Sequence, residues 1–145
     1  MARVLLLIPL LLVLLEGVNQ TPHPVVPTAP AAFRAATGPM LVLPSDGLFE
    51  LHVMLWSTDG YPKVANGLAA FVPTGQQRIR DTTVSFPDPA SVAFLRETGI
   101  RTVVVFPDRL AGTAWEGVPA RPVDGLGITR EEIDGALVYR LDQPR

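Results

Sequence analysis

The sequence contains no cysteine and only one lysine, Lys63, beside eleven arginines. Without cysteine the chain forms no disulfide, offers no thiol nucleophile and carries no lipid-modified N-terminal cysteine. The formal net charge is −2, and the basic residues are scattered along the chain. A surface that binds nucleic acid, or a polybasic patch for anionic lipids, is therefore not expected.

The motifs of common enzyme chemistry are also missing. No serine lies in a Gly-x-Ser-x-Gly elbow, and no Gly-x-Gly-x-x-Gly or Walker loop occurs. His23 and His52 have no cysteine or carboxylate at metal-ligand spacing. The charged run 130–134 is interpreted as a solvated helix N-terminus. We therefore expect no catalytic residue, no metal site and no cofactor.

An apolar run opens the chain, with Val4 to Leu15 following Met-Ala-Arg. Its length fits the hydrophobic region of a signal peptide, about 7–15 residues, and is short of the roughly 17–25 residues of a membrane span. Residues 1–18 are thus either an uncleaved anchor helix or a signal-like segment. A third interpretation places Met1 inside a longer gene that encodes the rest of the span. In each case residues 19–145 are expected on the extracytoplasmic side of the cell membrane.

Composition divides the remaining chain in two. Five of the fifteen prolines lie between residues 22 and 39, so residues 19–39 are interpreted as a stiff connector. Residues 40–145 are long enough for one modest core and are predicted to form a small α/β domain with a short mixed or parallel sheet.

The sequence predicts the first helices and strands of this domain with unequal clarity. Residues 40–45 are predicted as a buried strand, because a short apolar run ends at a proline and an Asp-Gly pair. Residues 48–56 fit a helix or a second strand. Residues 74–86 are predicted as a helix capped by Thr74, with its two arginines exposed.

The second half holds the clearest pattern. Asp88 and Pro89 form a helix start, and Gly99 is placed to end that helix. Residues 100–106 then read as a central strand that is buried on both faces, so helix and strand make half of a βαβ unit.

The remaining segments are less regular. Residues 112–118 and 127–134 are interpreted as short helical turns or loops, and residues 136–142 as a last strand at a sheet edge.

The stretch from Met54 to Phe71 contains all of the candidate binding residues. Two interpretations remain open. The stretch is either a turn region whose aromatics fill the core, or a loop on which aromatic rings, an amide and an ammonium group bind a sugar or a phosphate. The candidate ligand-binding residues are Trp56, Ser57, Asp59, Tyr61, Lys63 and Asn66.

Three stretches together carry a resemblance to a known family. They are "GPMLVLP" (38–44), "LWSTDGYPKVANGLAAFVP" (55–73) and "FPDPASVAFLRETGIRTVVVF" (86–106). In this order, after a hydrophobic helix and a proline-rich connector, they resemble the C-terminal extracytoplasmic domain of polytopic bacterial glycosyltransferase-like membrane proteins. Such proteins have the C-type fold and use polyprenyl-phosphate sugars. Residues 68–70 depart from the pattern.

The resemblance implies a division of labour. The catalytic carboxylate of such proteins is expected in an early loop between membrane helices, which this chain does not contain. The chain is therefore expected to be a C-terminal fragment of such a protein. It would be a non-catalytic, membrane-anchored domain, attached through residues 4–18, with a polyprenyl-phosphate sugar or glycan as ligand. The alternative is a small secreted or periplasmic binding module that signal-peptide cleavage releases.

Overall fold

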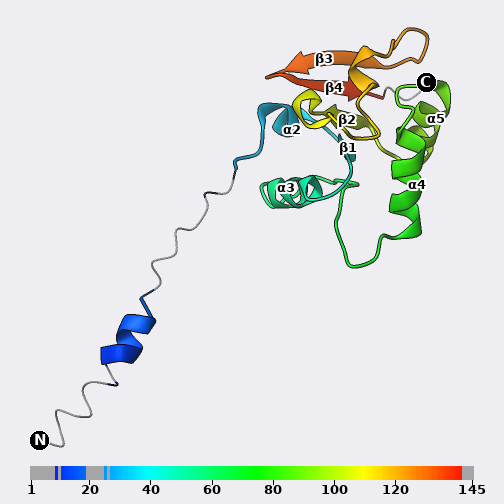
Figure 1. Ribbon diagram of the computed structural model, residues 1–145. Helices are drawn as coiled ribbons and strands as arrows, with labels where there is room; N and C mark the ends of the chain where they lie inside the picture. The colour runs from blue at the N-terminus through cyan, green and yellow to red at the C-terminus, as the bar shows by residue number, and fades with distance from the viewer. Residues whose placement is uncertain (1–8, 10, 19–24, 26, 142–145) are drawn as a thin grey trace, which may run out of the picture.

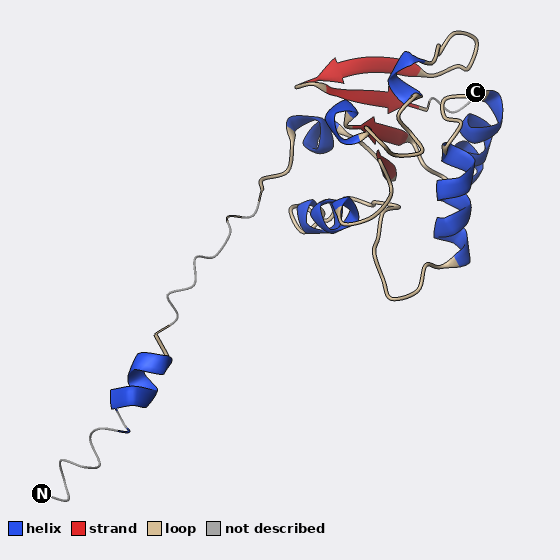
Figure 2. Cartoon of the chain, viewed as in Figure 1, coloured by secondary structure: helices blue, strands red, loops and turns tan. Residues whose placement is uncertain are grey.

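Four short strands form one mixed sheet, which separates two layers of helices in Figures 1 and 2. The structure is a computed structural model and describes residues 9, 11–18, 25 and 27–141. In chain order the elements are α2 (Ala31–Ala35), β1 (Met40–Leu43), α3 (Phe49–Trp56), α4 (Thr74–Thr83), α5 (Pro89–Glu97), β2 (Thr102–Val105), η1 (Pro107–Arg109), η2 (Val118–Ala120), β3 (Thr129–Ile133) and β4 (Ala136–Arg140). The predicted small α/β domain with a mixed sheet is confirmed.

The two central strands are buried along their whole length. β1 pairs with β2 in parallel, and the sheet order is β1-β2-β4-β3. Every residue of both strands is buried, as predicted. β2 is shorter than the predicted run 100–106, in which Arg101 is exposed and Phe106 is half-buried. Alternate side chains of β1 and β2 face a core under α4 and α5 and a second core under α2 and α3. The helices therefore enclose the parallel pair on both faces.

The last strands correct two predictions. The sequence predicts a short helical turn or loop over 127–134 and a helix N-terminus at 130–134, but β3 occupies most of this segment and pairs with β4. Because β3 is an exposed edge strand with four polar residues, its sequence lacks the apolar run that marks a strand. β4 is consequently an inner strand between β2 and β3, and its predicted place at the sheet edge is wrong.

The segment 48–56, whose pattern fits both a helix and a strand, forms the helix α3. Phe49, Val53 and Trp56 face the second core at helical spacing. Leu51 and Leu55 lie on the other side of the helix and are exposed. Apolar residues on both faces blur the helical period, which explains the ambiguity of the sequence.

α4 departs from the predicted helix 74–86 at both ends and at one side chain. It ends at Thr83 rather than at residue 86. The N-cap is Pro73, and Thr74 is the first helical residue rather than the cap. Arg78 is exposed as predicted. The side chain of Arg80 is only 15% exposed, because it turns inward to an ion pair with Glu50.

α5 begins and ends as its residues predict. The Asp88 carboxylate accepts a hydrogen bond from the Ser91 backbone N–H at 2.6 Å, and the Ser91 hydroxyl accepts one from the Asp88 N–H. Pro89 follows at the first helical position, and Gly99 leaves the helix at a φ of 81°. The capping box fixes how the chain enters α5, and Gly99 redirects it from the end of α5 toward β2.

Asp88→Ala is expected to lower the free energy of unfolding by about 1 kcal/mol at neutral pH, since an N-cap is lost. Burial raises the pKa of Asp88, but hydrogen bonds from Ser85, Ser91 and backbone N–H groups outweigh it and lower the net pKa below the ordinary value of 3.8. The stabilisation is therefore present above that value and is lost as the pH falls through the folded-state pKa. Denaturant unfolding at neutral and acid pH tests this, and Asp88→Asn should retain the cap but lose this pH dependence.

The predicted connector, residues 19–39, is packed onto the domain from Ala29 onward. Ala32 and Phe33 of α2 are buried in the second core. Of the predicted anchor or signal segment, residues 11–16 are helical and their side chains are exposed, while residues 1–8 and His23 lie outside the described residues. Within the described part of the chain no helix combines the length and apolarity of a membrane span, so the helix over 1–18 stays a prediction.

Candidate ligand-binding site

A pocket of about 400 Å³ opens beside the carboxyl end of β2, on the side of the sheet that α2 and α3 cover. Three aromatic residues, Phe49, Trp56 and Phe106, line it together with the charged residues Asp108, Arg109 and Asp134. We call it the aromatic pocket. Its place agrees with the general rule that open α/β sheets bind ligands beyond the carboxyl ends of their parallel strands.

The aromatic side chains come from two elements that the sheet brings together. Phe49 and Trp56 stand two helical turns apart on α3, and Phe106 directly follows β2. The Phe106 ring centroid lies 5.7 Å from that of Phe49 and 5.8 Å from that of Trp56, in tilted or edge-on geometry. These contacts support one another and hold the ring surfaces in place.

The start of the described domain supplies one wall of the pocket. The Trp56 indole Nε1 donates a hydrogen bond to the Pro27 carbonyl at 3.1 Å. Pro27, Thr28 and Pro30 all line the aromatic pocket. Trp56 itself is only 7% exposed, so its ring is held between the core and this segment.

The charged residues are placed by two tight turns. Asp108 and Arg109 belong to η1, which follows β2 directly, and their side chains form an ion pair at 3.3 Å. The Arg109 guanidinium carbon lies 5.9 Å from the Phe49 ring centroid. Asp134 and Gly135 form the two-residue turn between β3 and β4, with φ angles of 52° and 75°. Such a turn needs positive φ at both positions, which Asp-Gly provides.

This arrangement combines apolar ring surfaces with hydrogen-bonding groups at the rim. Both carboxylates and the guanidinium are exposed to water. Carboxylates accept hydrogen bonds from hydroxyl groups, and the guanidinium donates them. The pocket therefore suits a ligand with one apolar face and several hydroxyl groups.

The structure does not bring the sequence-predicted binding residues together at one site. Trp56 lines the aromatic pocket, while Asp59 lines a smaller pocket of about 240 Å³ that also touches Trp56. The Ser57 hydroxyl donates to the Met54 carbonyl of its own helix. Tyr61 is 82% exposed and has a positive φ of 49°, although a residue before a proline usually has an extended backbone.

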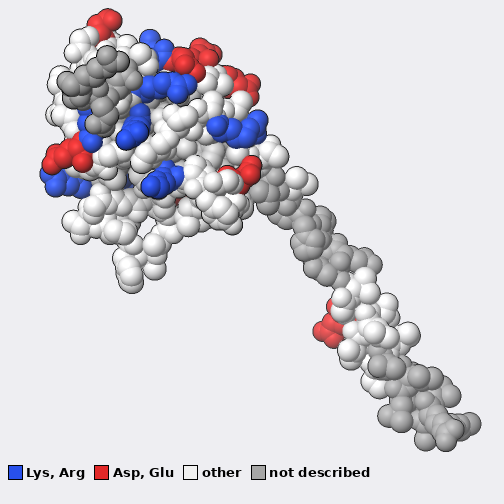
Figure 3. Space-filling model, turned by 180° about the vertical axis from the view of Figure 1, so that it is seen from behind, with Lys and Arg blue, Asp and Glu red and all other residues white. Residues whose placement is uncertain are grey.

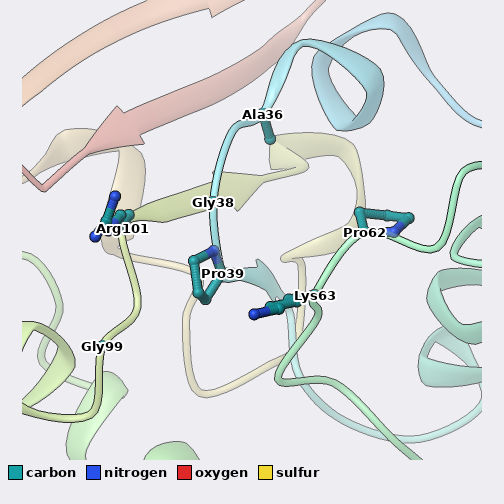
Figure 4. A pocket seen from close by; sticks show the side chains of 7 residues that line it. All are labelled: Ala36, Gly38, Pro39, Pro62, Lys63, Gly99 and Arg101. Carbon is teal, nitrogen blue, oxygen red and sulfur yellow. The ribbon is translucent and has the colours of Figure 1, made fainter.

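Lys63 lies elsewhere, in a shallow pocket beside the amino ends of β1 and β2. This pocket has about 490 Å³ and includes Arg101, Gly38 and Gly99 (Figure 4). Figure 4 shows the Lys63 and Arg101 side chains on either side of Pro39. It gathers two cations but no aromatic side chain.

Asn66 has a structural partner. Its side-chain Oδ1 accepts a hydrogen bond from the Val42 N–H at 2.7 Å, and its Nδ2 donates one to the Val42 carbonyl at 2.8 Å. The amide thereby pairs with the outer edge of β1 like the backbone of a neighbouring strand. The Met40 N–H and carbonyl bond in turn to the backbone of Lys63 and Ala65, which extends the cover of this edge.

Sequence reasoning missed five of the six side chains named for the aromatic pocket. Phe49 was hidden in a segment of undecided structure. Phe106 and Asp108 follow a buried strand directly, which is the available signal, because residues after parallel strands gather at one sheet edge. The pair Asp134-Gly135 is typical of a two-residue hairpin turn, but it predicts one only if residues 129–133 are recognised as a strand.

Over the described residues no group of three or more metal-ligating side chains occurs.

Comparisons with known proteins add no further information about this site. No family model matches the chain, and comparison with curated proteins and with solved structures finds no match.

Proposed function

We propose that the chain is a non-catalytic, sugar-binding extracytoplasmic domain of a glycosyltransferase-like membrane protein, anchored through residues 4–18. In this proposal the aromatic pocket binds the sugar of a polyprenyl-phosphate sugar or of a glycan. The observation that carries it is the meeting of Phe49, Trp56 and Phe106 with two carboxylates and a guanidinium at the end of β2. The family and the anchor rest on the sequence resemblance and on the apolar run.

The chemistry of the pocket supports a sugar. The C–H face of a pyranose ring is apolar and packs on aromatic surfaces, while its hydroxyls need acceptors and donors at the rim. Asp108 and Asp134 supply acceptors from different elements, and Arg109 supplies donors. A purely apolar ligand would form no hydrogen bonds with these three groups.

The same features support binding rather than catalysis. Asp108 and Asp134 are both exposed, so neither has the desolvated surroundings that prepare a carboxyl group for acid catalysis. No nucleophile with an adjacent base is found among the described residues near the pocket. The resemblance, too, assigns the catalytic carboxylate to a loop outside this chain.

If the protein is instead a released secreted or periplasmic module, the position of signal-peptide cleavage decides whether the aromatic pocket is kept. Cleavage near residue 20 leaves Pro27 and Ala29 in place. Cleavage after Ala31 removes the Pro27 carbonyl that Trp56 binds and the buried Ala29. Only the earlier cleavage keeps the aromatic pocket intact. N-terminal sequencing of the exported protein separates the retained anchor from the released module.

Sugar binding can be followed through Trp56. The chain has two tryptophans, so Trp115→Phe leaves Trp56 as the single reporter in the pocket. We expect monosaccharides, disaccharides or a short-chain polyprenyl-phosphate sugar to change its fluorescence saturably. Asp108→Asn and Asp134→Asn should each weaken binding by about tenfold or more, because a hydrogen bond to a charged group contributes roughly 1.5–3 kcal/mol.

The matched control is Glu97→Gln. It removes one negative charge from an exposed position on α5, which covers the opposite face of the sheet. It should leave the affinity unchanged. Equal losses in all three variants would indicate a general charge effect, and a fluorescence that does not respond to any of the sugars would contradict the proposal.

A further inference from the structure

The outer face of α3 and the loop that follows it expose apolar side chains to an unusual extent. Leu48, at the N-cap, is 74% exposed and Leu51 is 47% exposed. Phe71 in the loop between α3 and α4 is 84% exposed. Scattered apolar residues are normal on a surface, but a contiguous apolar face marks a site of interaction. We call this surface, formed by Leu48, Leu51, Met54, Leu55, Phe71 and Val72, the α3 face.

The helical geometry makes the part of the face that lies on α3 continuous. Leu48, Leu51 and Leu55 follow at spacings of three and four residues, so they form one stripe along α3, opposite Val53 and Trp56 of the core. The Leu68 backbone N–H lies 3.2 Å from the Met54 sulfur, which joins the loop to the helix. The loop projects from the domain in Figure 1.

Charge is nearly absent from this part of the molecule. The one charged residue of α3, Glu50, is fully buried, and residues 64–77 contain no charged residue. Figure 3 shows that the projecting end of the domain carries no charged side chain on the face in view. A protein partner usually meets a polar rim around an apolar centre. A face this apolar, with an aromatic residue at its tip, fits the interface of a lipid bilayer.

The N-terminal segment favours the bilayer as the occupant. The side chains from Leu11 to Leu15 are each about 60% exposed, so this helical stretch is apolar all round and the described part of the domain leaves it uncovered. The chain from Leu15 to Pro27 spans at most about 43 Å even when fully extended. An inserted N-terminal segment would thus keep the α3 face within reach of the same membrane.

We propose that the α3 face docks on the lipid bilayer in which residues 4–18 are anchored, with Phe71 and the leucine stripe in the interfacial region. The inference rests on the anchoring in the proposed function and adds an orientation to it. The aromatic pocket, which α3 also lines, then lies beside the membrane surface. A sugar carried on a membrane-embedded lipid would reach it there.

The absence of cysteine allows a direct test on the full chain. Single variants Leu51→Cys, Phe71→Cys and Leu12→Cys, each labelled with an environment-sensitive fluorophore, are reconstituted in phosphatidylcholine vesicles that contain acyl-chain nitroxide lipids. Glu97→Cys on α5 is the matched control. We expect a blue-shifted emission and quenching at positions 12, 51 and 71, and neither at position 97.

The outcomes separate the two proposals. Quenching at position 12 alone would overturn the docking of the α3 face and leave the anchor in place. No quenching at position 12 would contradict the anchor itself. A blue shift at position 71 that nitroxide lipids do not quench would identify a second copy or another protein as the occupant and overturn docking on lipid. Adding Leu55→Glu should abolish quenching at position 71 but not at position 12, if the face binds as one surface.

Discussion

Arg80→Leu is expected to lower the free energy of unfolding by about 3–5 kcal/mol, because it leaves the Glu50 carboxylate buried without its cation. The Glu50 side chain has no exposed surface. Its Oε1 accepts a hydrogen bond from the Ser45 hydroxyl at 2.6 Å and lies 3.4 Å from the Arg80 guanidinium. Small domains have only about 5–15 kcal/mol of stability in total. Chemical denaturation followed by circular dichroism should therefore show a much lower midpoint.

Removing the charge of the partner residue, in Glu50→Gln, should lower the free energy of unfolding by less than Arg80→Leu does. In Glu50→Gln the amide oxygen can still accept from Ser45, and Arg80, which is partly exposed, can turn to water. Combining Glu50→Gln with Arg80→Leu should restore most of the loss, since no buried charge remains. Arg78→Leu on the same helix is the matched control and should change stability by no more than about 1 kcal/mol. Equal losses for Arg78→Leu and Arg80→Leu would refute a specific role of the buried pair.

This ion pair shows where local patterns in the sequence stop being informative. The start of α5 was predictable because Asp88, Pro89 and Gly99 act within a few residues of one another. The central strands were predictable because their apolar runs are continuous. Arg80 was expected in water, since nothing near it in the sequence indicates an acid thirty residues away. Long-range partners of polar groups depend on how the helices pack on the sheet.

In the candidate site, too, residue types could be recognised from the sequence, but the long-range contacts between them could not. Trp56 was identified from its residue type, and it does line a pocket. Its companions Phe106 and Asp134 come from the ends of separate strands, and β3 was not recognised because its exposed edge is polar. Lys63 is close to Trp56 in sequence but lines a different pocket, at the amino ends of the strands. Nearness in sequence was therefore a poor guide to which residues share a pocket.

Asn66→Ala is expected to lower the free energy of unfolding by about 2–5 kcal/mol, because two buried backbone groups lose their partner. Val42 is fully buried, and both its N–H and its carbonyl bond to the Asn66 amide. The substitution would also uncover the edge of β1, and open edges favour pairing with other chains. Denaturant unfolding measures the loss, and the Val42 amide should exchange with solvent faster.

Two further variants test whether the stability depends on both hydrogen bonds of the Asn66 amide. Asn66→Asp keeps an acceptor for the Val42 N–H but faces the Val42 carbonyl with a second acceptor, so it should not restore stability. Ser57→Ala, which removes an exposed hydroxyl that bonds only within its own helix, should change stability by less than about 0.5 kcal/mol. If Asn66→Ala instead weakened sugar binding and left unfolding unchanged, Asn66 would be a ligand residue and its cover of the β1 edge would be dispensable. We expect the opposite, because both hydrogen-bonding groups of its side chain are already used by Val42.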